Sequence, residues 1–297
     1  MTKLYQKGQA LVLVLLSLAV VLTLVLFVLS RSVTDISVSS KNEEAIRAFS
    51  AAEAGVEKAL VIGTGTNNVT IGDAIYSSLV TSYAEGTKDF VYPIEMSSGD
   101  TAVTWFADHD AATGNTLCNA THPCFTGNTF KVCWAKTNTL SAVAVTPAVE
   151  ISVFYETTPG SIATTRIARA TFDPFSGRTP ANGFAGVDIG TCTISGTVYQ
   201  FQKTFQFSSL GIPAGSYNVA GGLQFARVRL FYNTNTTQNI ATSVNFAGDS
   251  NLPSQGQSIV ATGTAGESNR KINVFQGWPE TPSVFDGAVY SSIGLTK

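Results

Sequence analysis

The four cysteines are the residues of this sequence whose types and spacing most clearly indicate a chemical role, the formation of disulfides. Cys118 and Cys124 lie six positions apart around a loop that contains Pro123, and Cys133 and Cys192 each lie in a strand-like run. This arrangement favours one bridge between Cys118 and Cys124 and a second between Cys133 and Cys192. Four cysteines allow three pairings, so the other two stay open. All four follow the apolar N-terminal segment, and disulfides persist in extracytoplasmic compartments.

A zinc site is the alternative use of the same residues. Its ligands would be Cys118, His122, Cys124 and Cys133. Their spacing does not match the common zinc patterns, in which ligands come in closely spaced pairs. We therefore predict disulfides and no metal.

Other polar clusters offer little for binding or catalysis. The run Asp108-His109-Asp110, with Asn115, supplies oxygen atoms that calcium prefers but lacks EF-hand spacing, so a solvated loop is favoured. The two histidines, His109 and His122, accompany no GxSxG, HExxH or GxxxxGK[ST] motif. We predict that the chain is not an enzyme and holds no cofactor. A membrane-anchored hydrolase remains an alternative, since the residues of a Ser/His/Asp site need to be close in space but not in sequence.

The composition excludes several classes of protein. The chain has 297 residues, of which 44% are hydrophobic and 13% are charged, with a formal net charge of −2. This balance provides material for a core but no basic surface for nucleic acid. It also differs from that of a disordered acidic tail.

An uninterrupted apolar run near the N-terminus indicates a membrane helix. Residues 9–30 contain no charge, proline or glycine, and Lys3 and Lys7 precede them. A helix of about 20 residues spans a hydrocarbon core of about 30 Å, whereas a secretory signal has a shorter apolar region and a cleavage site. We predict a retained transmembrane helix over residues 9–30, with the N-terminus in the cytoplasm because of the lysines.

The helix is expected to continue to about residue 62. From Ile46 onward, apolar residues recur every three or four positions in one stripe of Ile46, Phe49, Ala52, Val56, Ala59 and Leu60. No proline occurs before Pro93. The first half of this stem suits lipid, and the stripe on the second half is expected to pack on a globular head.

These N-terminal features resemble those of type IV prepilins. A short basic leader ends in Gly8, and the run Phe49-Ser50-Ala51-Ala52-Glu53-Ala54-Gly55-Val56-Glu57 is similar to that of PilX-type minor pilins. The resemblance covers residues 1–60. It implies cleavage by a prepilin peptidase after Gly8, methylation of the new N-terminus at Gln9, and assembly into a filament. It also implies a chain held in the cytoplasmic membrane before assembly, with an extracytoplasmic head and with other pilins or pseudopilins as partners along its N-terminal helix.

Two positions depart from the family pattern. Most pilins carry a glutamate at the fifth mature position, where this chain has Leu13, which we place with the stem-packing residues. In the family that carboxylate pairs with the terminal amine of a neighbouring subunit, and an intramembrane charge costs about 2.5–3.5 kcal/mol. Tip pseudopilins of type II secretion similarly lack it, so we hypothesise a tip or priming subunit. Ser30 stands where major pilins have a helix-breaking proline, which predicts a straighter stem.

The remainder of the chain has alternating patterns typical of strands. We expect four strands between residues 102 and 172 to form a meander over the stem, and a second group between residues 186 and 275. The predicted fold class is α+β, a long N-terminal helix with a head built as an antiparallel sheet or sandwich. The predicted segments are a leader over 1–8, a stem over 9–62, a pilin-like head over 63–178 and a second β-rich region over 179–297.

The predicted function is therefore structural. The chain is expected to be a minor pilin or pseudopilin of a type IV pilus-like filament, at the cell surface after assembly. The alternative is a single-pass membrane-anchored surface adhesin or ligand-binding protein outside any filament.

Overall fold

One helix, α1, accounts for the whole stem. The computed structural model describes residues 9–111 and 113–280, and α1 runs unbroken over Gln9–Ile62. The hydroxyls of Ser17 and Thr23 donate to carbonyls one turn earlier, so they do not interrupt the apolar surface. The helix ends at Gly63, which adopts a left-handed φ of 70° and donates its N–H to Ala59 O at 2.8 Å. The predicted stem over residues 9–62 is confirmed.

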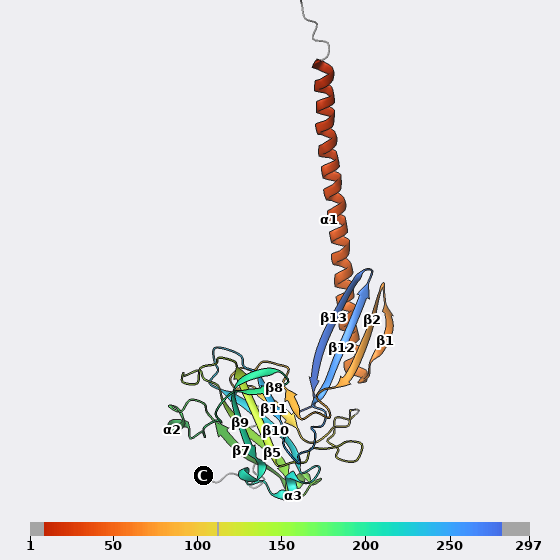
Figure 1. Cartoon of the computed structure of the whole chain (residues 1–297). Helices are drawn as coiled ribbons and strands as arrows, with labels where there is room; N and C mark the ends of the chain where they lie inside the picture. The colour runs from red at the N-terminus through yellow and green to blue at the C-terminus, as the bar shows by residue number, and fades with distance from the viewer. Residues whose placement is uncertain (1–8, 112, 281–297) are drawn as a thin grey trace, which may run out of the picture. The chain divides into compact units, whose positions relative to one another are not determined.

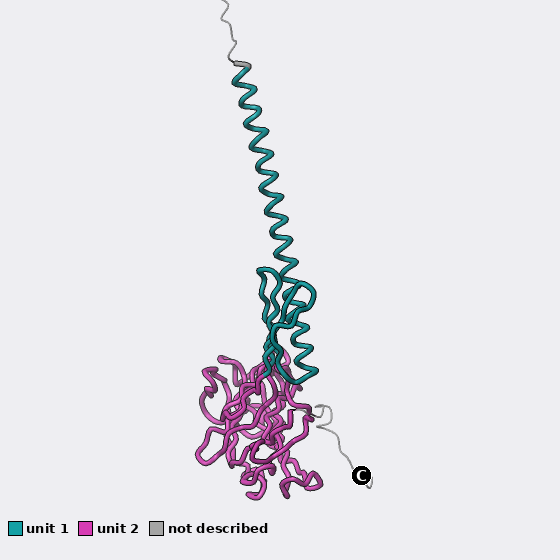
Figure 2. The backbone as a smooth tube through the Cα atoms, turned by 90° about the vertical axis from the view of Figure 1, so that its right-hand side faces the viewer, with its two compact units in different colours: residues 1–80, 259–274 teal, residues 81–258, 275–297 magenta. Residues whose placement is uncertain are grey.

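The chain divides into two compact units, coloured separately in Figure 2. Unit 1 comprises residues 1–80 and 259–274, and unit 2 comprises residues 81–258 and 275–297. The chain therefore passes between the units three times. Residues 81–258 of unit 2 are inserted between the two segments of unit 1, and the chain enters unit 2 again at residue 275.

The sheet of unit 1 combines segments from both ends of the described chain. Its four strands lie in the order β1-β2-β12-β13 beside α1 (Figure 1), with bounds Thr66–Ile71, Ala74–Ser82, Gly256–Ala265 and Ser268–Gly277. β1 and β2 form an antiparallel hairpin. The prediction that strands between residues 102 and 172 cover the stem is wrong. Those strands belong to unit 2, and a hairpin from residues 256–277 takes their place.

Small side chains line the face of α1 that packs on this sheet. We call this face the helix seat: its buried residues are Ala48, Ala51, Ala52, Gly55, Val56 and Ala59. They contact buried side chains of β2 and β12, namely Ala74, Tyr76, Ile259, Ala261 and Ala265.

The closest approach between α1 and its sheet is at Gly263 of β12. A Cβ atom at this position would lie 2.0 Å from Ala48 O and 2.5 Å from Ala52 N. Real Cβ atoms do not approach that closely, so the helix backbone occupies the space where a side chain would be. Only glycine fits there.

Unit 2 is a two-layer sandwich of antiparallel sheets. One sheet has the order β4-β10-β6-β7, with bounds Thr101–Trp105, Leu223–Phe231, Ala148–Glu156 and Thr165–Phe172. The other has the order β3-β11-β5-β9-β8, with bounds Asp89–Val91, Ile240–Ser243, Thr129–Lys136, Thr197–Gln206 and Cys192–Ile194. Four short helical turns connect strands: η1 (Ile162–Thr164), α2 (Thr179–Asn182), η2 (Phe207–Leu210) and α3 (Ala214–Tyr217).

The inward side chains of both sheets form a single aromatic-rich core. Phe106, Phe125, Phe130 and Phe207 are fully buried, and their ring centroids lie 5.2–6.4 Å apart in the pairs that touch. Such pairs contribute about 0.5–1.5 kcal/mol beyond the area they bury. The expectation of an α+β chain with an antiparallel β-rich head is confirmed, and the head is a sandwich.

The division predicted at residues 178 and 179 does not match this arrangement. β5 precedes that point and pairs with β9, which follows it, and β6 likewise pairs with β10. Residues on the two sides therefore share both sheets and one core. A division of the head into two consecutive regions fails here because strands far apart in the chain pair with one another.

Replacement of Gly263 by alanine is predicted to loosen the helix seat. The added methyl group must displace the α1 backbone, and overpacking of this kind costs about 1–3 kcal/mol. Hydrogen exchange measured by mass spectrometry on the full chain in detergent should show protection of residues 256–265 falling by about one to two orders of magnitude. Gly186→Ala is the control, since a Cβ there meets nothing within 4 Å. Unchanged protection in Gly263→Ala would contradict the packing described.

Candidate functional site

The first half of α1 presents an apolar surface on all sides. Every large apolar side chain from Leu11 to Leu29 is at least 49% exposed. The most apolar window of 18 residues has a mean hydropathy of 3.3, and none of it is buried. Among the described residues, α1 is the one helix long and apolar enough to cross a membrane. By length and composition it fits a single membrane span.

The stem-packing residues expected from the sequence separate onto different faces. Val56 is 8% exposed and belongs to the helix seat, whereas Leu13, Phe49 and Leu60 are 65%, 47% and 41% exposed. The prediction that Phe49 and Leu60 pack on the head is wrong. Their side chains are too large for a contact in which the α1 and β12 backbones nearly touch. Gln9 is the first residue of α1, and Gly8 lies outside the described residues.

The second half of α1 therefore has two apolar faces. Ile46, Phe49 and Leu60, which we call the outer stripe, lie about 100–160° round the helix from Ala48 of the helix seat at 3.6 residues per turn, on a neighbouring face. The unit 1 sheet covers the seat and leaves the outer stripe exposed. The stripe predicted from the sequence combined residues of both faces: Ala52, Val56 and Ala59 belong to the seat, whereas Ile46, Phe49 and Leu60 form the outer stripe.

Both disulfides have the pairing that the sequence favoured. Cys118 is joined to Cys124, with 5.4 Å between their Cα atoms, and Cys133 to Cys192, with 6.0 Å. No free cysteine remains, so the zinc alternative has no thiolate ligands.

The Cys133–Cys192 bridge fastens the short edge strand β8 to the middle of its sheet. β8 pairs with β9 and also contacts β3 and β11. Cys133, Cys192 and Tyr199 are buried in a small cluster, separate from the main core, that also includes Ala241. The bridge therefore holds β8 over the outer surface of the five-stranded sheet.

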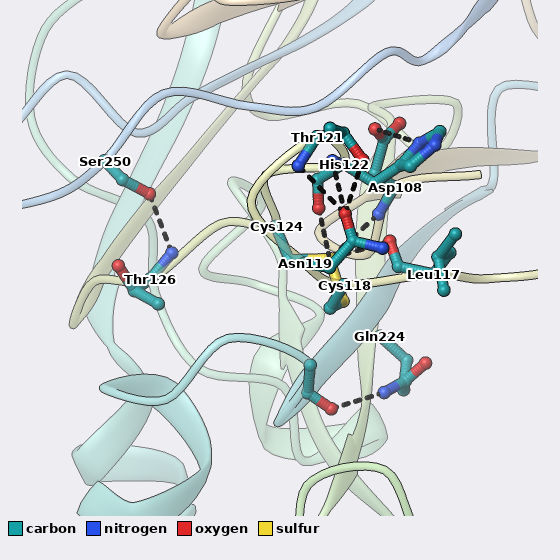
Figure 3. Close-up of a disulfide and its surroundings, with 11 residues drawn as sticks. Asp108, Leu117, Cys118, Asn119, Thr121, His122, Cys124, Thr126, Gln224 and Ser250 are labelled. Carbon is teal, nitrogen blue, oxygen red and sulfur yellow. Dashed lines mark hydrogen bonds and ion pairs between the residues drawn. A yellow bond between two sulfur atoms is a disulfide. The ribbon is translucent and has the colours of Figure 1, made fainter. Parts of the chain in front are cut away.

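The Cys118–Cys124 bridge closes a loop whose conformation depends on internal hydrogen bonds (Figure 3). Asn119 Oδ1 accepts hydrogen bonds from Thr121 N, Thr121 Oγ1 and His122 N. His122 Nδ1 lies 3.2 Å from Asp108 Oδ2, which ties the loop to the end of the preceding segment.

The proposed calcium ligands are used within the protein. Asp108 pairs with His122, and Asp110 Oδ1 accepts a hydrogen bond from Thr113 N at 2.9 Å. In residues 9–111 and 113–280, no three His, Cys, Asp or Glu side chains are grouped to hold a metal ion. The oxygens of this run stabilise a turn and a loop rather than converging on one point.

His109 lies in an aromatic enclosure that the sequence did not indicate. Its ring is 4.3 Å from Trp105, edge to face, and 4.9 Å from Trp278 in a stacked geometry. Trp278 Nε1 donates to Ser254 O at 2.9 Å, which fixes the indole over the imidazole. Burial lowers the pKa of His109 to about 4.

Acidification is predicted to destabilise unit 2 through His109. The folded pKa is about 4 and the unfolded value is about 6.5, so the unfolded state binds more protons between these values. The stability contributed by neutral His109 is complete above pH 6.5 and is lost as the pH falls towards 4, by about 3 kcal/mol. Near-UV circular dichroism melts should show a smaller acid-induced loss in His109→Phe than in the wild type. Equal losses would contradict the assignment, and His122→Gln is the control.

Loss of the long-range disulfide is predicted to cost more stability than loss of the local one. The bridges close loops of 59 and 6 residues, for which the chain-entropy model gives about 4 and about 2 kcal/mol. Guanidinium unfolding followed by near-UV circular dichroism should give this order for Cys133→Ala/Cys192→Ala against Cys118→Ala/Cys124→Ala. The reverse order would show that the short loop is the more important constraint.

The apolar first half of α1 and the outer stripe are the largest exposed apolar surfaces of the described helix, and the first half is a possible membrane anchor. No relative adds to them: no protein-family model, curated protein or solved structure matches this chain.

Proposed function

We propose that this chain is a structural subunit of a type IV pilus-like filament, a minor pilin or pseudopilin held in the cytoplasmic membrane before assembly. One observation carries the proposal. α1 continues from Gln9 to Ile62 with an apolar membrane-length half and, further on, an exposed outer stripe. A simple membrane anchor requires only the first of these surfaces.

The outer stripe supports lateral packing against another subunit. Ile46, Phe49 and Leu60 lie beyond the membrane-length half, where water rather than lipid would surround them. Full burial of such side chains contributes about 1.5–3 kcal/mol each. The same holds for the first half of α1 once it leaves the bilayer, because only other apolar stems replace the lipid. Both surfaces thus favour a bundle of stems.

The prepilin-like N-terminus supports processing before assembly. The leader that ends in Gly8 would be removed by a prepilin peptidase, and Gln9 would become the methylated N-terminus. Leu13 supports a position at the tip or in priming, because a subunit there has no neighbour above it whose terminal amine needs a carboxylate. The partners in this proposal are other pilins or pseudopilins, bound through α1.

A membrane-anchored adhesin or ligand-binding protein outside any filament is the second candidate. It is favoured by the sandwich of unit 2, which has a core and two disulfides of its own. In that case α1 would act as an anchor and the head would carry the binding activity.

Mass spectrometry of the mature N-terminus separates the two candidates. Co-expression with a prepilin peptidase should yield a chain that begins at methylated Gln9, and Gly8→Val should retain the leader. An intact N-terminus in the presence of active peptidase would favour the anchored protein. Immunogold labelling should place the chain at filament ends, and labelling along whole filaments would overturn the tip assignment.

The outer stripe is tested by a charge placed on it. Phe49→Asp should leave the head folded, because Phe49 is exposed, and should reduce incorporation into filaments at least tenfold. Val61→Asp is the matched control, since Val61 is 84% exposed on the same helix and lies off the stripe. Equal incorporation of both variants would contradict a packing role for the stripe.

A further inference from the structure

Unit 2 contains a pocket of about 410 Å³ beside the Cys118–Cys124 bridge. Three segments enclose it: the disulfide loop, the turn that follows β6, and the residues that precede β10. Its lining includes Leu117, Glu156, Gly160, Ile162, Ala220 and Gln224. Among these described residues there is no lysine, arginine or histidine.

Glu156, the last residue of β6, is an acidic residue buried in this wall. It is 4% exposed, and its backbone is fixed on both sides. Its N–H donates to Gly222 O at 2.8 Å, and its carbonyl oxygen accepts a hydrogen bond from Ser216 Oγ at 2.7 Å. The position of the side chain is therefore set by the strand and not by a flexible loop.

The carboxylate of Glu156 reaches towards the turn that forms part of the pocket. Its Oε2 accepts a hydrogen bond from Ser161 N at 2.8 Å, and Ser161 lies between the lining residues Gly160 and Ile162. A carboxylate can accept about four hydrogen bonds. Within the described part of the chain, no ion pair involves Glu156. A buried charge without a counter-charge is costly, and a cation in the pocket would relieve that cost.

The remaining walls combine polar groups with a few apolar side chains that can contact an alkyl chain. Leu117 and Ile162 are exposed apolar side chains at the pocket, and Ala220 adds a small one. Figure 3 shows Gln224 and Leu117 beside the disulfide; Gln224 Nε2 donates to Gly221 O, which leaves the amide oxygen as a further acceptor. Acceptors therefore accompany an apolar wall.

We propose that this pocket binds a primary ammonium group carried on an unbranched alkyl chain, with the Glu156 carboxylate as its counter-ion. A lysine side chain and a free alkylamine share this chemistry, since each has a hydrocarbon stem and a compact charged end. The site lies in unit 2, makes no use of α1, and is independent of filament assembly.

The test is an NMR titration of the full chain in detergent with n-butylammonium, with 1-butanol as the uncharged probe of similar size. n-Butylammonium should bind at least tenfold more tightly than 1-butanol, because only the cation offsets the buried charge. Glu156→Gln keeps an acceptor for Ser161 N but removes the charge, and should weaken n-butylammonium binding at least tenfold. Glu85→Gln, an exposed glutamate that does not line the pocket, should bind as the wild type does.

A second variant tests the pocket without altering its acid. Ala220 is exposed and lines the pocket, so Ala220→Trp should block entry while Glu156 and the fold stay intact. Ala220→Trp should also lower the affinity for n-butylammonium at least tenfold. If Glu156→Gln does not fold, the result with Ala220→Trp tests the proposal. Equal affinity for butanol and n-butylammonium, or unchanged binding in Ala220→Trp, would overturn the proposal.

The source of the ammonium group is distinguished by a lysine peptide. If acetyl-Gly-Lys-Gly-amide binds at least tenfold more tightly than n-butylammonium, the occupant is a lysine of a protein. Similar or weaker binding of the peptide assigns the pocket to free amines. If the peptide still binds to both Glu156→Gln and Ala220→Trp, its binding site lies outside this pocket, and this result would contradict the proposal.

Discussion

Backbone-to-backbone contact between α1 and β12 at Gly263 is the constraint on which the architecture depends. Because a Cβ at this position would meet Ala48 O at 2.0 Å, the helix and the strand approach as closely as polypeptides can. The contact brings a hairpin from residues 256–277 back to a helix that ends at residue 62. In the order of the chain, the sandwich is therefore an insertion between β2 and β12.

The sequence predicts the parts of this molecule that depend on local pattern. The absence of proline and the Gly63 terminus define α1, and the two disulfide pairs are the ones that cysteine spacing and strand-like surroundings favoured among three possible pairings. It predicts one apolar stripe on the second half of α1 but does not separate the residues that the sheet covers from those that stay exposed. Ala48 and Ala52 carry almost no hydrophobic signal, whereas Phe49 carries a strong one and is exposed. Small residues allow the helix to approach the sheet closely, and this approach depends on Gly263, which lies far from them along the chain.

The candidate sites also divide into those that the sequence predicts and those that depend on the fold. The membrane-length surface of α1 is evident from composition alone, because its high hydropathy is a sum over side chains and does not depend on the fold. Glu156 and His109 have ordinary sequence neighbours, and their chemistry arises from burial. Glu156 depends on turns contributed by residues 159–162 and 220–224, and His109 depends on Trp278, which lies far along the chain. Such environments exist only after strands distant in sequence have paired.

The three passages of the chain between the units have a consequence for cleavage of the chain. With a single linker, one cut would leave no covalent connection between the units. Here the chain crosses at residues 80–81, 258–259 and 274–275, within or next to hydrogen-bonded strands of one sheet. The two units are therefore joined by three covalent connections, so a cut in any one of them leaves two in place.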